Sequence, residues 1–519
     1  MAEKSHSTTF VNVNIIPMDT ECVLENQTVI VENDRIKNIG PTDEVRIPEA
    51  TEIIMSDGAY LMPGLADMHM HITSIGRTFD GPNQLWLYLA EGVTSIRNLS
   101  ALPEHLVWQD AVDRGNRMGP TIYNGRLVAG LPTELQSMRY IFRVFFILLP
   151  VLIGLILWLL VWAGLKLFGD ITQFYEIAFY ILPSLVGLLL IGFLVAWIKI
   201  IPFNFYVSRK FPFAMIPETP AEARRFVRDI KENGYDFVKV YDWMSRESYL
   251  AAMDEARLQK IYAIGHLLDE LTLNAIYEGG LQEAAHMDEF IDSHLIRETS
   301  PGKGFNEVDF NYETISQSAA KTKANQVMVV SNMVADETVY KLLEDPEAGL
   351  AQSEYTIVPV AVLEIWKTRG RLVNWQGQQS WRRNVLQPFL LTMSKALHDA
   401  GVPLLIGTDM TVEGMLPSHI HRELEILVEA GLTPFEALEA GTKNAAISVE
   451  RMGRNGNFGT VEIGQRADLI LIKENPLENV SHTRNRIGVM ARGQWFPQAK
   501  LDGLVDDYVA SFNQSTSTG

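Results

Sequence analysis

The sequence predicts an α/β fold: a (β/α)8 TIM-type barrel with a composite β-sandwich domain from both termini and a two-helix transmembrane insertion. Strand-like and helix-like segments alternate along the middle of the chain, strand-rich segments flank that region, and two uncharged runs interrupt it. The predicted parts are residues 1–60 plus 456–500 for the composite domain, 61–139 and 211–455 for the barrel, 140–210 for the insertion and 501–519 for a C-terminal tail.

The two terminal regions have the composition of β-strands. Near the amino terminus, VNVNIIPM and NQTVIVEN are apolar and rich in β-branched residues, and DRIKNIG follows with an Asn-Asp turn signal. Near the carboxyl terminus, ADLILIKENP and IGVMARGQWF have the same character. Two strand-rich ends that flank a helix-rich middle indicate one composite sheet domain built from both termini.

The middle of the chain contains eight strand candidates with helical patterns between them, such as AEARRFVRDIKENG and HRELEILVEAG. Eight strand-helix units predict a (β/α)8 barrel, in which chemistry gathers at the carboxyl ends of the strands. The strands are expected at residues 65–71, 92–98, 120–126, 236–242, 260–266, 283–289, 326–332 and 403–409.

Two uncharged runs of 22 residues, 144–165 and 177–198, separate the third strand from the fourth. As a helix, each run would reach roughly 33 Å, compared with about 30 Å for the hydrocarbon core of a bilayer. The alternative is a pair of buried core helices, although soluble helices rarely stay apolar all round for that length. We therefore expect a transmembrane helical hairpin within residues 140–210.

The charges that flank the two runs predict an orientation. Five positive residues lie on the outer flanks and one, Lys166, lies on the hairpin side; the five are Arg139, Arg143, Lys199, Arg209 and Lys210. This bias predicts an integral, two-pass membrane protein with the barrel on the cytoplasmic side, in the inner membrane if the source is bacterial. The aromatic and basic residues after the second run are expected to lie at the bilayer interface.

Composition excludes one class of partner. The net charge is −19 and the pI is near 5.1. Nucleic-acid binding is not expected, because contacts to phosphates need clustered lysine and arginine. The single cysteine, Cys22, excludes internal disulfides and suits a reducing compartment.

Residues that can bind a metal fall at the ends of the predicted strands. His69 and His71 are two apart on the first strand, so both imidazoles point the same way and can hold one ion. Each residue of the set has a plainer explanation when taken singly, such as a hydrogen-bonded core histidine or a capping aspartate. A lysine inside a parallel strand is harder to explain, because an unpaired buried ammonium is costly. The later members of the set are Lys239, His266, His286 and Asp409.

The chain resembles the amidohydrolase superfamily, specifically its binuclear, carboxylated-lysine subgroup of metal-dependent hydrolases related to prolidase and imidazolonepropionase-like enzymes. The resemblance covers nearly all of residues 10–495 apart from the insertion. The motifs that carry it, in order, are MPGLADMHMH, GPTIYNG, DFVKVYD, IGH, AAHMDE, LLIGTD, GLTPFEALEAGTKNAA and GTVEIGQRADLIL. The ordered set is highly specific, whereas no single motif would be.

The resemblance implies a role for each ligand candidate. His69, His71 and Asp409 would hold one divalent ion, and His266 with His286 would hold a second. Lys239, converted by CO2 to N6-carboxylysine, would bridge the two ions, for which zinc is the expected identity. A hydroxide between the ions would be the nucleophile, and Asp409 would accept its proton and pass it to the leaving amine.

Four further residues are weaker candidates for contact with substrate. Tyr241 and Tyr123 lie at predicted strand ends, where a phenol could donate a hydrogen bond to a developing oxyanion. His419 and His421 follow the eighth strand and could approach a substrate. At least one of these two histidines is alternatively a helix-start residue that faces solvent.

The position of the insertion leads to a hypothesis about the substrate. The insertion lies in a βα loop, and all βα loops open on the catalytic face of a barrel. We therefore expect a membrane-anchored amidohydrolase acting on a lipid-like amide, for example an N-acyl amino acid or N-acyl amino alcohol. The alternatives are a membrane-tethered dipeptidase or small-amide hydrolase and a catalytically inactive membrane scaffold or lipid-binding protein. The expected partners are a membrane lipid or acylated substrate, the bilayer, and a possible second copy of the chain.

Overall fold

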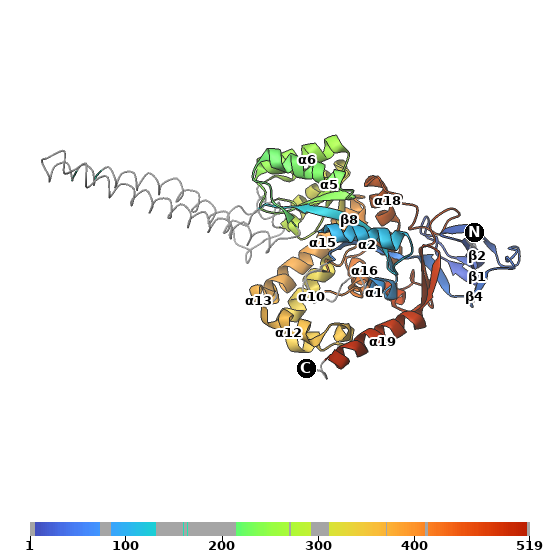
Figure 1. The fold of residues 1–519 in the computed structure, drawn as a ribbon. Helices are drawn as coiled ribbons and strands as arrows, with labels where there is room; N and C mark the ends of the chain where they lie inside the picture. The colour runs from blue at the N-terminus through green and yellow to red at the C-terminus, as the bar shows by residue number, and fades with distance from the viewer. Residues whose placement is uncertain are drawn as a thin grey trace, which may run out of the picture. The chain divides into compact units, whose positions relative to one another are not determined.

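The computed structural model describes residues 6–72, 85–130, 214–268, 271–291, 311–369, 371–410 and 414–515, together with residues 159 and 163. By its internal contacts the chain divides into a large unit, Met1–Val128 with Pro217–Gly519, and a small unit, Ala129–Ile216. The large unit holds the two main sheets shown in Figure 1. The small unit contains strand β9 (Ala214–Met215).

The first sheet combines strands from both ends of the chain in the order β17-β16-β15-β5-β1-β2-β3, with β4 paired to β1. Its hydrophobic core includes Phe10, Leu61 and Leu471, which are fully buried. The strands are β1 (Ser7–Ile15), β2 (Leu24–Glu32), β3 (Arg35–Pro41), β4 (Glu52–Met55), β5 (Tyr60–Pro63), β15 (Leu469–Ile472), β16 (Arg486–Ala491) and β17 (Gln494–Pro497).

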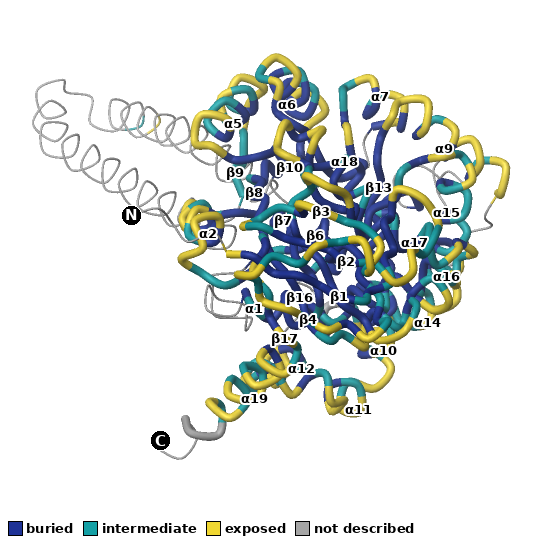
Figure 2. Tube along the Cα trace, turned by 90° about the vertical axis from the view of Figure 1, so that its right-hand side faces the viewer, coloured by how far each residue is buried: buried dark blue, intermediate teal, exposed yellow. Residues whose placement is uncertain are grey.

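The second sheet is a nearly closed parallel barrel of eight strands, consistent with a TIM-type barrel, in the order β14-β13-β12-β11-β10-β8-β7-β6. Each of the eight strands predicted from the sequence overlaps one of these. Their residues are buried almost throughout (Figure 2). The strands are β6 (Leu65–Met70), β7 (Val93–Asn98), β8 (Thr121–Val128), β10 (Phe237–Val240), β11 (Tyr262–Gly265), β12 (Glu283–Ala284), β13 (Met328–Val330) and β14 (Leu404–Leu405).

The barrel closes between its first and last strands through single contacts rather than a full ladder. The backbone N–H of Met68 donates to the carbonyl of Ile406 at 2.9 Å, and the N–H of Asp409 donates to the carbonyl of His69 at 2.7 Å. An isolated parallel bridge joins Met70 to Met410. This seam therefore brings residue 409 beside the end of β6.

Helices surround the barrel, and many of them have one face packed and the other exposed (Figure 2). Those before the seventh strand are α1 (Trp86–Ala90), α2 (Pro103–Asp113), α5 (Pro220–Glu232), α6 (Arg246–Gln259), α7 (Leu273–Glu278) and α9 (Tyr312–Ala324). A longer set lies between β13 and β14: α10 (Met333–Glu344), α11 (Pro346–Leu350), η2 (Ser353–Ile357), α12 (Val360–Arg369), α13 (Arg371–Asn374), α14 (Gln379–Trp381), η3 (Arg382–Leu386) and α15 (Gln387–Asp399). The remainder are α16 (His419–Glu429), α17 (Pro434–Gly441), α18 (Lys443–Arg451), η4 (Val480–Arg484) and α19 (Gln498–Ser515).

Local sequence signals explain where helices begin. Helix α17 starts with a capping box, in which the hydroxyl of Thr433 accepts from the N–H of Glu436 at 3.2 Å. The Glu436 carboxylate in turn accepts from the N–H of Thr433 at 2.8 Å. Proline follows the capping threonine both here and at α5, where Thr219 caps the helix.

The expectation of an integral two-pass membrane protein requires correction. Within the part of the chain that the structure describes, no helix combines the length and the apolar character needed to cross a bilayer. Helix α19 is 18 residues long but carries four charged side chains, those of Lys500, Asp502, Asp506 and Asp507. The runs 144–165 and 177–198, on which the expectation rested, lie outside the described residues except for residues 159 and 163.

Candidate metal centre

The end of β6 places two imidazoles side by side. The β6 residues from Leu65 to Met70 are all buried, and His71 follows directly. The rings of His69 and His71 are 5.3 Å apart. His69 Nδ1 lies 2.8 Å from the carbonyl oxygen of Ala285, and His71 Nδ1 lies 2.7 Å from Ser100 Oγ. With their Nδ1 atoms held by these partners, both rings present Nε2 as the ligand atom.

Asp409 brings a carboxylate to the same point. Its Oδ1 lies 3.5 Å from His69 Nε2 and 3.3 Å from His71 Nε2. Burial opposes its ionisation, but the hydrogen bond from His71 and the nearby charge of Lys239 hold the pKa of Asp409 well below its usual range. The residue has a φ of 49°, in the left-handed region that non-glycine residues rarely adopt and that recurs at functional sites.

The sequence before Asp409 allows this close approach. An added Cβ at Gly407 would lie 2.6 Å from His69 Cβ and 2.6 Å from Asn332 Oδ1. Any larger residue would therefore push β6 and the residue-409 segment apart. Close packing at the barrel seam therefore explains why LLIGTD has a glycine at position 407.

Lys239 lies inside the barrel next to these groups. It is fully buried in β10, and its Nζ is 3.2 Å from His69 Nε2. Burial lowers the pKa of Lys239 to about 8. A larger fraction of the amine is therefore neutral near neutral pH than in an exposed lysine, and the neutral amine is the form that can react with CO2.

A second pair of imidazoles comes from the next two strands. The ring of His286 is 4.3 Å from that of His69 and 4.8 Å from that of His266. Asn332 Nδ2 lies 3.1 Å from His286 Nδ1. His266 Nδ1 lies 2.9 Å from Asp242 Oδ1 and 2.8 Å from Glu289 Oε1.

The donor set fits two divalent cations. Ligand atoms of His69, His71 and Asp409 lie within 4.8 Å of one another, and so do those of His266, His286 and Glu289. His266 Nε2 is buried without a hydrogen-bond partner, which a bound cation would explain. Burial lowers the pKa values of His69 and His286 well below their usual range, so both are neutral, as metal ligands must be.

The structure thus brings together all six ligand candidates: His69, His71, Lys239, His266, His286 and Asp409. Sequence reasoning did not identify Asp242 and Glu289, whose carboxylates contact Nδ1 of His266. Each stands three residues after a predicted ligand, Lys239 and His286 respectively. That spacing at a strand end is the signal that could have found them.

The two tyrosine candidates lie in different surroundings. Tyr241 is beside the centre, with its ring 4.0 Å from that of His266, and Lys239 Nζ is 5.3 Å from the Tyr241 ring centre. Tyr123 belongs to the buried core cluster that includes Phe237. Burial raises the pKa of Tyr123, and the nearby charge of Arg466 opposes this rise.

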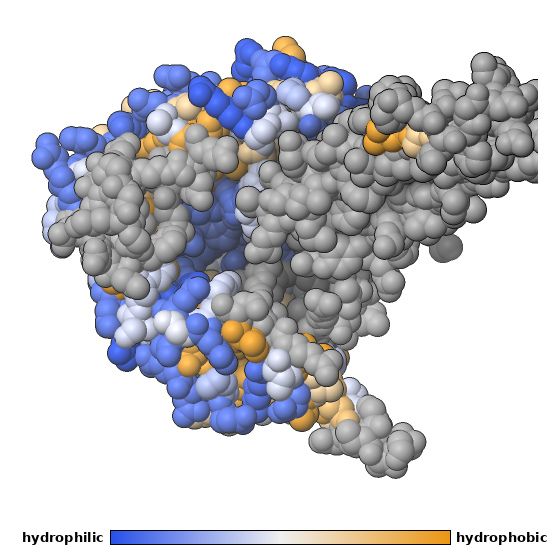
Figure 3. Space-filling view, turned by 90° about the vertical axis from the view of Figure 1, so that its left-hand side faces the viewer, coloured by the Kyte–Doolittle hydropathy of each residue, from blue (hydrophilic) through white to orange (hydrophobic). Residues whose placement is uncertain are grey.

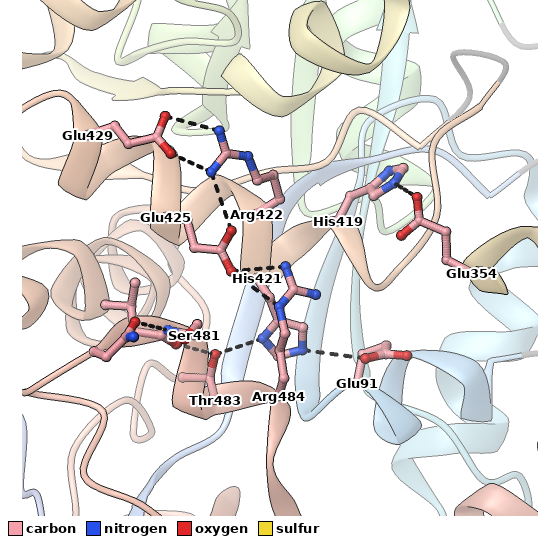
Figure 4. Close-up of polar contacts among 12 residues, drawn as sticks. Glu91, Glu354, His419, His421, Arg422, Glu425, Glu429, Ser481, Thr483 and Arg484 are labelled. Carbon is pink, nitrogen blue, oxygen red and sulfur yellow. Dashed lines mark hydrogen bonds and ion pairs between the residues drawn. The ribbon is translucent and has the colours of Figure 1, made fainter. Parts of the chain in front are cut away.

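His419 and His421 lie in a separate polar cluster at the start of α16 (Figure 4). His421 is fully buried, with Nδ1 2.8 Å from Thr483 Oγ1 and Nε2 3.4 Å from Glu91. His419 Nε2 lies 3.4 Å from Glu354 Oε1. Neither belongs to the two ligand groups, and neither faces solvent as a helix-start residue was expected to, because packing against other elements buries both.

One face of the molecule is hollowed, as the space-filling view shows (Figure 3). The described residues deep in this hollow are hydrophilic, whereas apolar residues appear at parts of its edge.

Comparison with known proteins gives the following matches. The sequence model of the Amidohydrolase family matches residues 218–496. Ochratoxinase from Aspergillus niger is 33% identical over 151 residues, which are 28% of this chain and 28% of that protein. The match thus spans less than a third of the relative's length.

Solved structures share the fold at low sequence identity. A bottromycin amidohydrolase has a TM-score of 0.63 at 17% identity, covering 98% of this chain and 92% of its own. A Xaa-Pro dipeptidase with bound methionine in the active site has a TM-score of 0.59 at 15% identity, covering 95% and 100%. The Aspergillus niger ochratoxinase structure has a TM-score of 0.57 at 18% identity, covering 95% and 96%.

Proposed function

Because this chain belongs to the amidohydrolase family, we propose that it is a hydrolase of amide C–N bonds that uses two divalent metal ions, with zinc as the expected metal. The observation that carries the proposal is the convergence of six ligand candidates, from five strands or the segments that follow them, in two adjacent ligand groups. A scaffold without activity would have no need of such a set, because buried charges and imidazoles are costly to keep together.

Metal ions bound there would polarise the scissile carbonyl and lower the pKa of a water molecule. The contact of His69 Nδ1 with Ala285 and that of His71 Nδ1 with Ser100 fix the two rings. Their Nε2 atoms are thereby directed toward Asp409. Asp409 is ionised at neutral pH, so it can accept a proton from the attacking water and return it to the amine nitrogen that leaves.

Lys239 as N6-carboxylysine would replace a costly buried cation with an anionic oxygen donor between the two ligand groups. Its depressed pKa, full burial and contact with His69 support this role. Tyr241 is placed to meet the substrate, since its ring centre lies 4.0 Å from that of His266.

The substrate class that we propose is an amide whose amine side is an amino acid, such as an N-acyl amino acid or a dipeptide. The likeness to a Xaa-Pro dipeptidase supports a peptide-type amide. The lipid-like acyl group expected from the sequence depended on a membrane-spanning hairpin, and the described residues contain no such helix. Long-chain acyl groups therefore enter only as one arm of the substrate test.

The test is hydrolysis by the zinc-loaded protein of long-chain N-acyl amino acids, N-acetyl amino acids and Xaa-Pro dipeptides. We expect turnover of at least one class and about two zinc ions per chain. His69→Ala should lose one ion and lower kcat/KM by about a thousandfold, because one metal contributes several kcal/mol to the transition state.

The matched control is His6→Ala, because His6 is a histidine on the surface with a side chain 57% exposed. It should retain wild-type zinc content and turnover. If the protein binds no zinc and cleaves none of the three classes, the proposal of a metal-dependent hydrolase is wrong and the alternative of a catalytically inactive scaffold is favoured. A preference for short, polar amides would refute the lipid arm alone.

A further inference from the structure

The loop between β10 and α6 carries an exposed tryptophan at the catalytic face of the barrel. Trp243 lies between Val240, which ends β10, and Ser245, the N-cap of α6. Loops that follow barrel strands open on the face where the carboxyl ends of the strands meet. Trp243 is 42% exposed and is the most exposed of the tryptophans that the structure describes. Single exposed apolar residues are common on protein surfaces, so the surroundings decide whether this exposure has a function.

The two neighbours of Trp243 fix the loop in place. Asp242 Oδ1 lies 2.9 Å from Nδ1 of the ligand candidate His266. On the other side, Met244 is buried, with 4% of its surface exposed. Trp243 is therefore turned outward between two anchored residues, and its exposure is a feature of a fixed loop.

The backbone of Trp243 is strained. Its φ is 62°, in the left-handed region that a bulky side chain adopts only against a steric cost. Strain of this kind recurs at ligand-binding sites, where the surrounding structure holds it in place. For stability alone this position would suit glycine or asparagine, and the ring would not be left in water. The free protein thus gains little stability from an indole here, which points to a role in binding.

Ring contacts connect Trp243 to the metal centre. Its ring centre lies 5.9 Å from that of Tyr241, at an interplanar angle of 66°. The Tyr241 ring centre in turn lies 4.0 Å from that of His266 and 5.3 Å from Lys239 Nζ. Tyr241 is itself partly exposed. Tyr241 and Trp243, the aromatic pair, therefore form a continuous ring surface from the ligand groups out to solvent.

We propose that the aromatic pair binds an aromatic or large apolar group of the amide substrate, and that Trp243 is a specificity-determining residue. Covering the exposed indole would remove its apolar surface from water, and offset or edge-to-face contact would favour a flat ring. The group belongs either to the acyl side or to the amine side of the amide, and the test distinguishes the two. The inference rests on the proposed function, because it assumes that an amide is bound at the metal centre.

The first test compares N-acetyl-L-alanine with N-acetyl-L-phenylalanine, which has a ring on the amine side, and with N-benzoyl-L-alanine, which has a ring on the acyl side. Wild type should prefer one of the two aromatic compounds over N-acetyl-L-alanine by about 10- to 100-fold in kcat/KM. In Trp243→Ala this ratio should fall toward one, and the compound that loses its advantage identifies the side. Trp243→Phe should keep part of the preference, because a smaller ring still covers the apolar group.

Two variants separate recognition from structure. Trp243→Gly releases the backbone strain, because glycine adopts a φ of 62° without steric cost, and it should show the same loss of preference as Trp243→Ala. Leu258→Ala removes a 61% exposed apolar side chain near the carboxyl end of α6 and should keep the wild-type ratio. An unchanged ratio in both Trp243 variants, or an equal loss on all three substrates, would overturn the proposal.

A binding measurement distinguishes this inference from the proposed function. Isothermal titration calorimetry of the same three compounds into the zinc-loaded protein needs no turnover. Wild type should bind one aromatic compound more tightly than N-acetyl-L-alanine, and Trp243→Gly should lose that difference. If no amide is hydrolysed but this difference is present and lost, the proposed function fails and recognition by Trp243 stands. If neither aromatic compound binds more tightly than N-acetyl-L-alanine, or if the difference persists in Trp243→Gly, the inference is wrong.

Discussion

At the scale of single residues, the surroundings of His266 differ from those of the other ligand candidates. Two carboxylates, those of Asp242 and Glu289, lie within 3 Å of its Nδ1. One N–H can be donated fully to only one acceptor, so the second carboxylate acts mainly through its charge. Burial opposes protonation, but the two carboxylates raise the pKa of His266 to about 9. In the metal-free protein this imidazole is therefore protonated at neutral pH.

Asp242→Asn tests this arrangement. Removing the charge should loosen the orientation of His266 and lower zinc affinity at that position by about 10- to 100-fold. A ligand must release its proton before a metal binds, so wild-type affinity should rise with pH up to about 9, and the variant should reach its plateau at lower pH. Zinc titration against a competing chelator measures both effects.

The control for that measurement is Glu255→Gln, a carboxylate of α6 that pairs with Arg228 at 3.1 Å. It should leave zinc affinity and its pH dependence unchanged. If Asp242→Asn also matched wild type, Glu289 alone would be sufficient to orient His266.

At the scale of elements, a buried ion pair joins strands across the barrel. Arg97 of β7 and Glu283 of β12 are both fully buried. Arg97 Nη1 donates to Glu283 Oε2 at 3.0 Å, its Nη2 donates to Oε1, and its Nε donates to the carbonyl of Met68 at 2.7 Å. Ser448 of α18 also donates to Glu283 Oε2 at 2.9 Å. Three strands and one helix are thus tied together at one point.

Glu283→Gln should lower the free energy of unfolding by about 3–5 kcal/mol, because it leaves the Arg97 charge buried without compensation. The double change Arg97→Met with Glu283→Leu should be less damaging than Glu283→Gln, since it removes both charges. Urea unfolding followed by circular dichroism measures the difference.

The exposed pair Arg114–Asp110 provides a control, because its side chains are 70% and 57% exposed. Asp110→Asn should cost no more than about 1 kcal/mol, as expected for a solvated pair. A double variant less stable than Glu283→Gln would show that the charges contribute more than their burial costs.

At the scale of the whole molecule, the first ligand group spans the seam of the barrel. His69 and His71 follow β6, and Asp409 lies on the segment after β14, on the other side of the seam. The described hydrogen bonds across this seam are sparse. A cation held by residues on both sides would therefore link the first and last strands, and its binding would stabilise the folded barrel.

Metal removal should consequently lower the melting temperature of the whole barrel rather than affect turnover alone. At zinc concentrations about a hundred times the dissociation constant, binding contributes roughly 2.7 kcal/mol, which is a shift of several degrees. Differential scanning calorimetry of chelated, zinc-loaded and zinc-plus-bicarbonate samples measures it.

Bicarbonate should add stability beyond zinc alone if Lys239 is carboxylated. Lys239→Arg should not respond to bicarbonate. Asp409→Asn should show a smaller zinc-induced shift than wild type, because one side of the seam loses its ligand. Equal melting temperatures with and without zinc would contradict the role of the seam.

The sequence by itself determined the alternation of strands and helices and the residue types of the centre. These depend on local signals: β-branched runs, helix-start residues such as Thr433, and motifs in which His69, Lys239 and Asp409 end or lie within strands. Because parallel strands in a barrel present their carboxyl ends on one face, the order of motifs was enough to predict which side chains meet.

Tertiary structure alone decided which partners orient those side chains and which candidates stay apart. Tyr123 lies in the core near Arg466, and His421 is buried against Thr483, because neighbours distant in sequence occupy the space around them. The pairing of Arg382 with Asp336 likewise joins two helices that no local pattern relates. Packing determines side-chain contacts between residues far apart in the sequence, and the periodicity of the sequence does not predict these contacts.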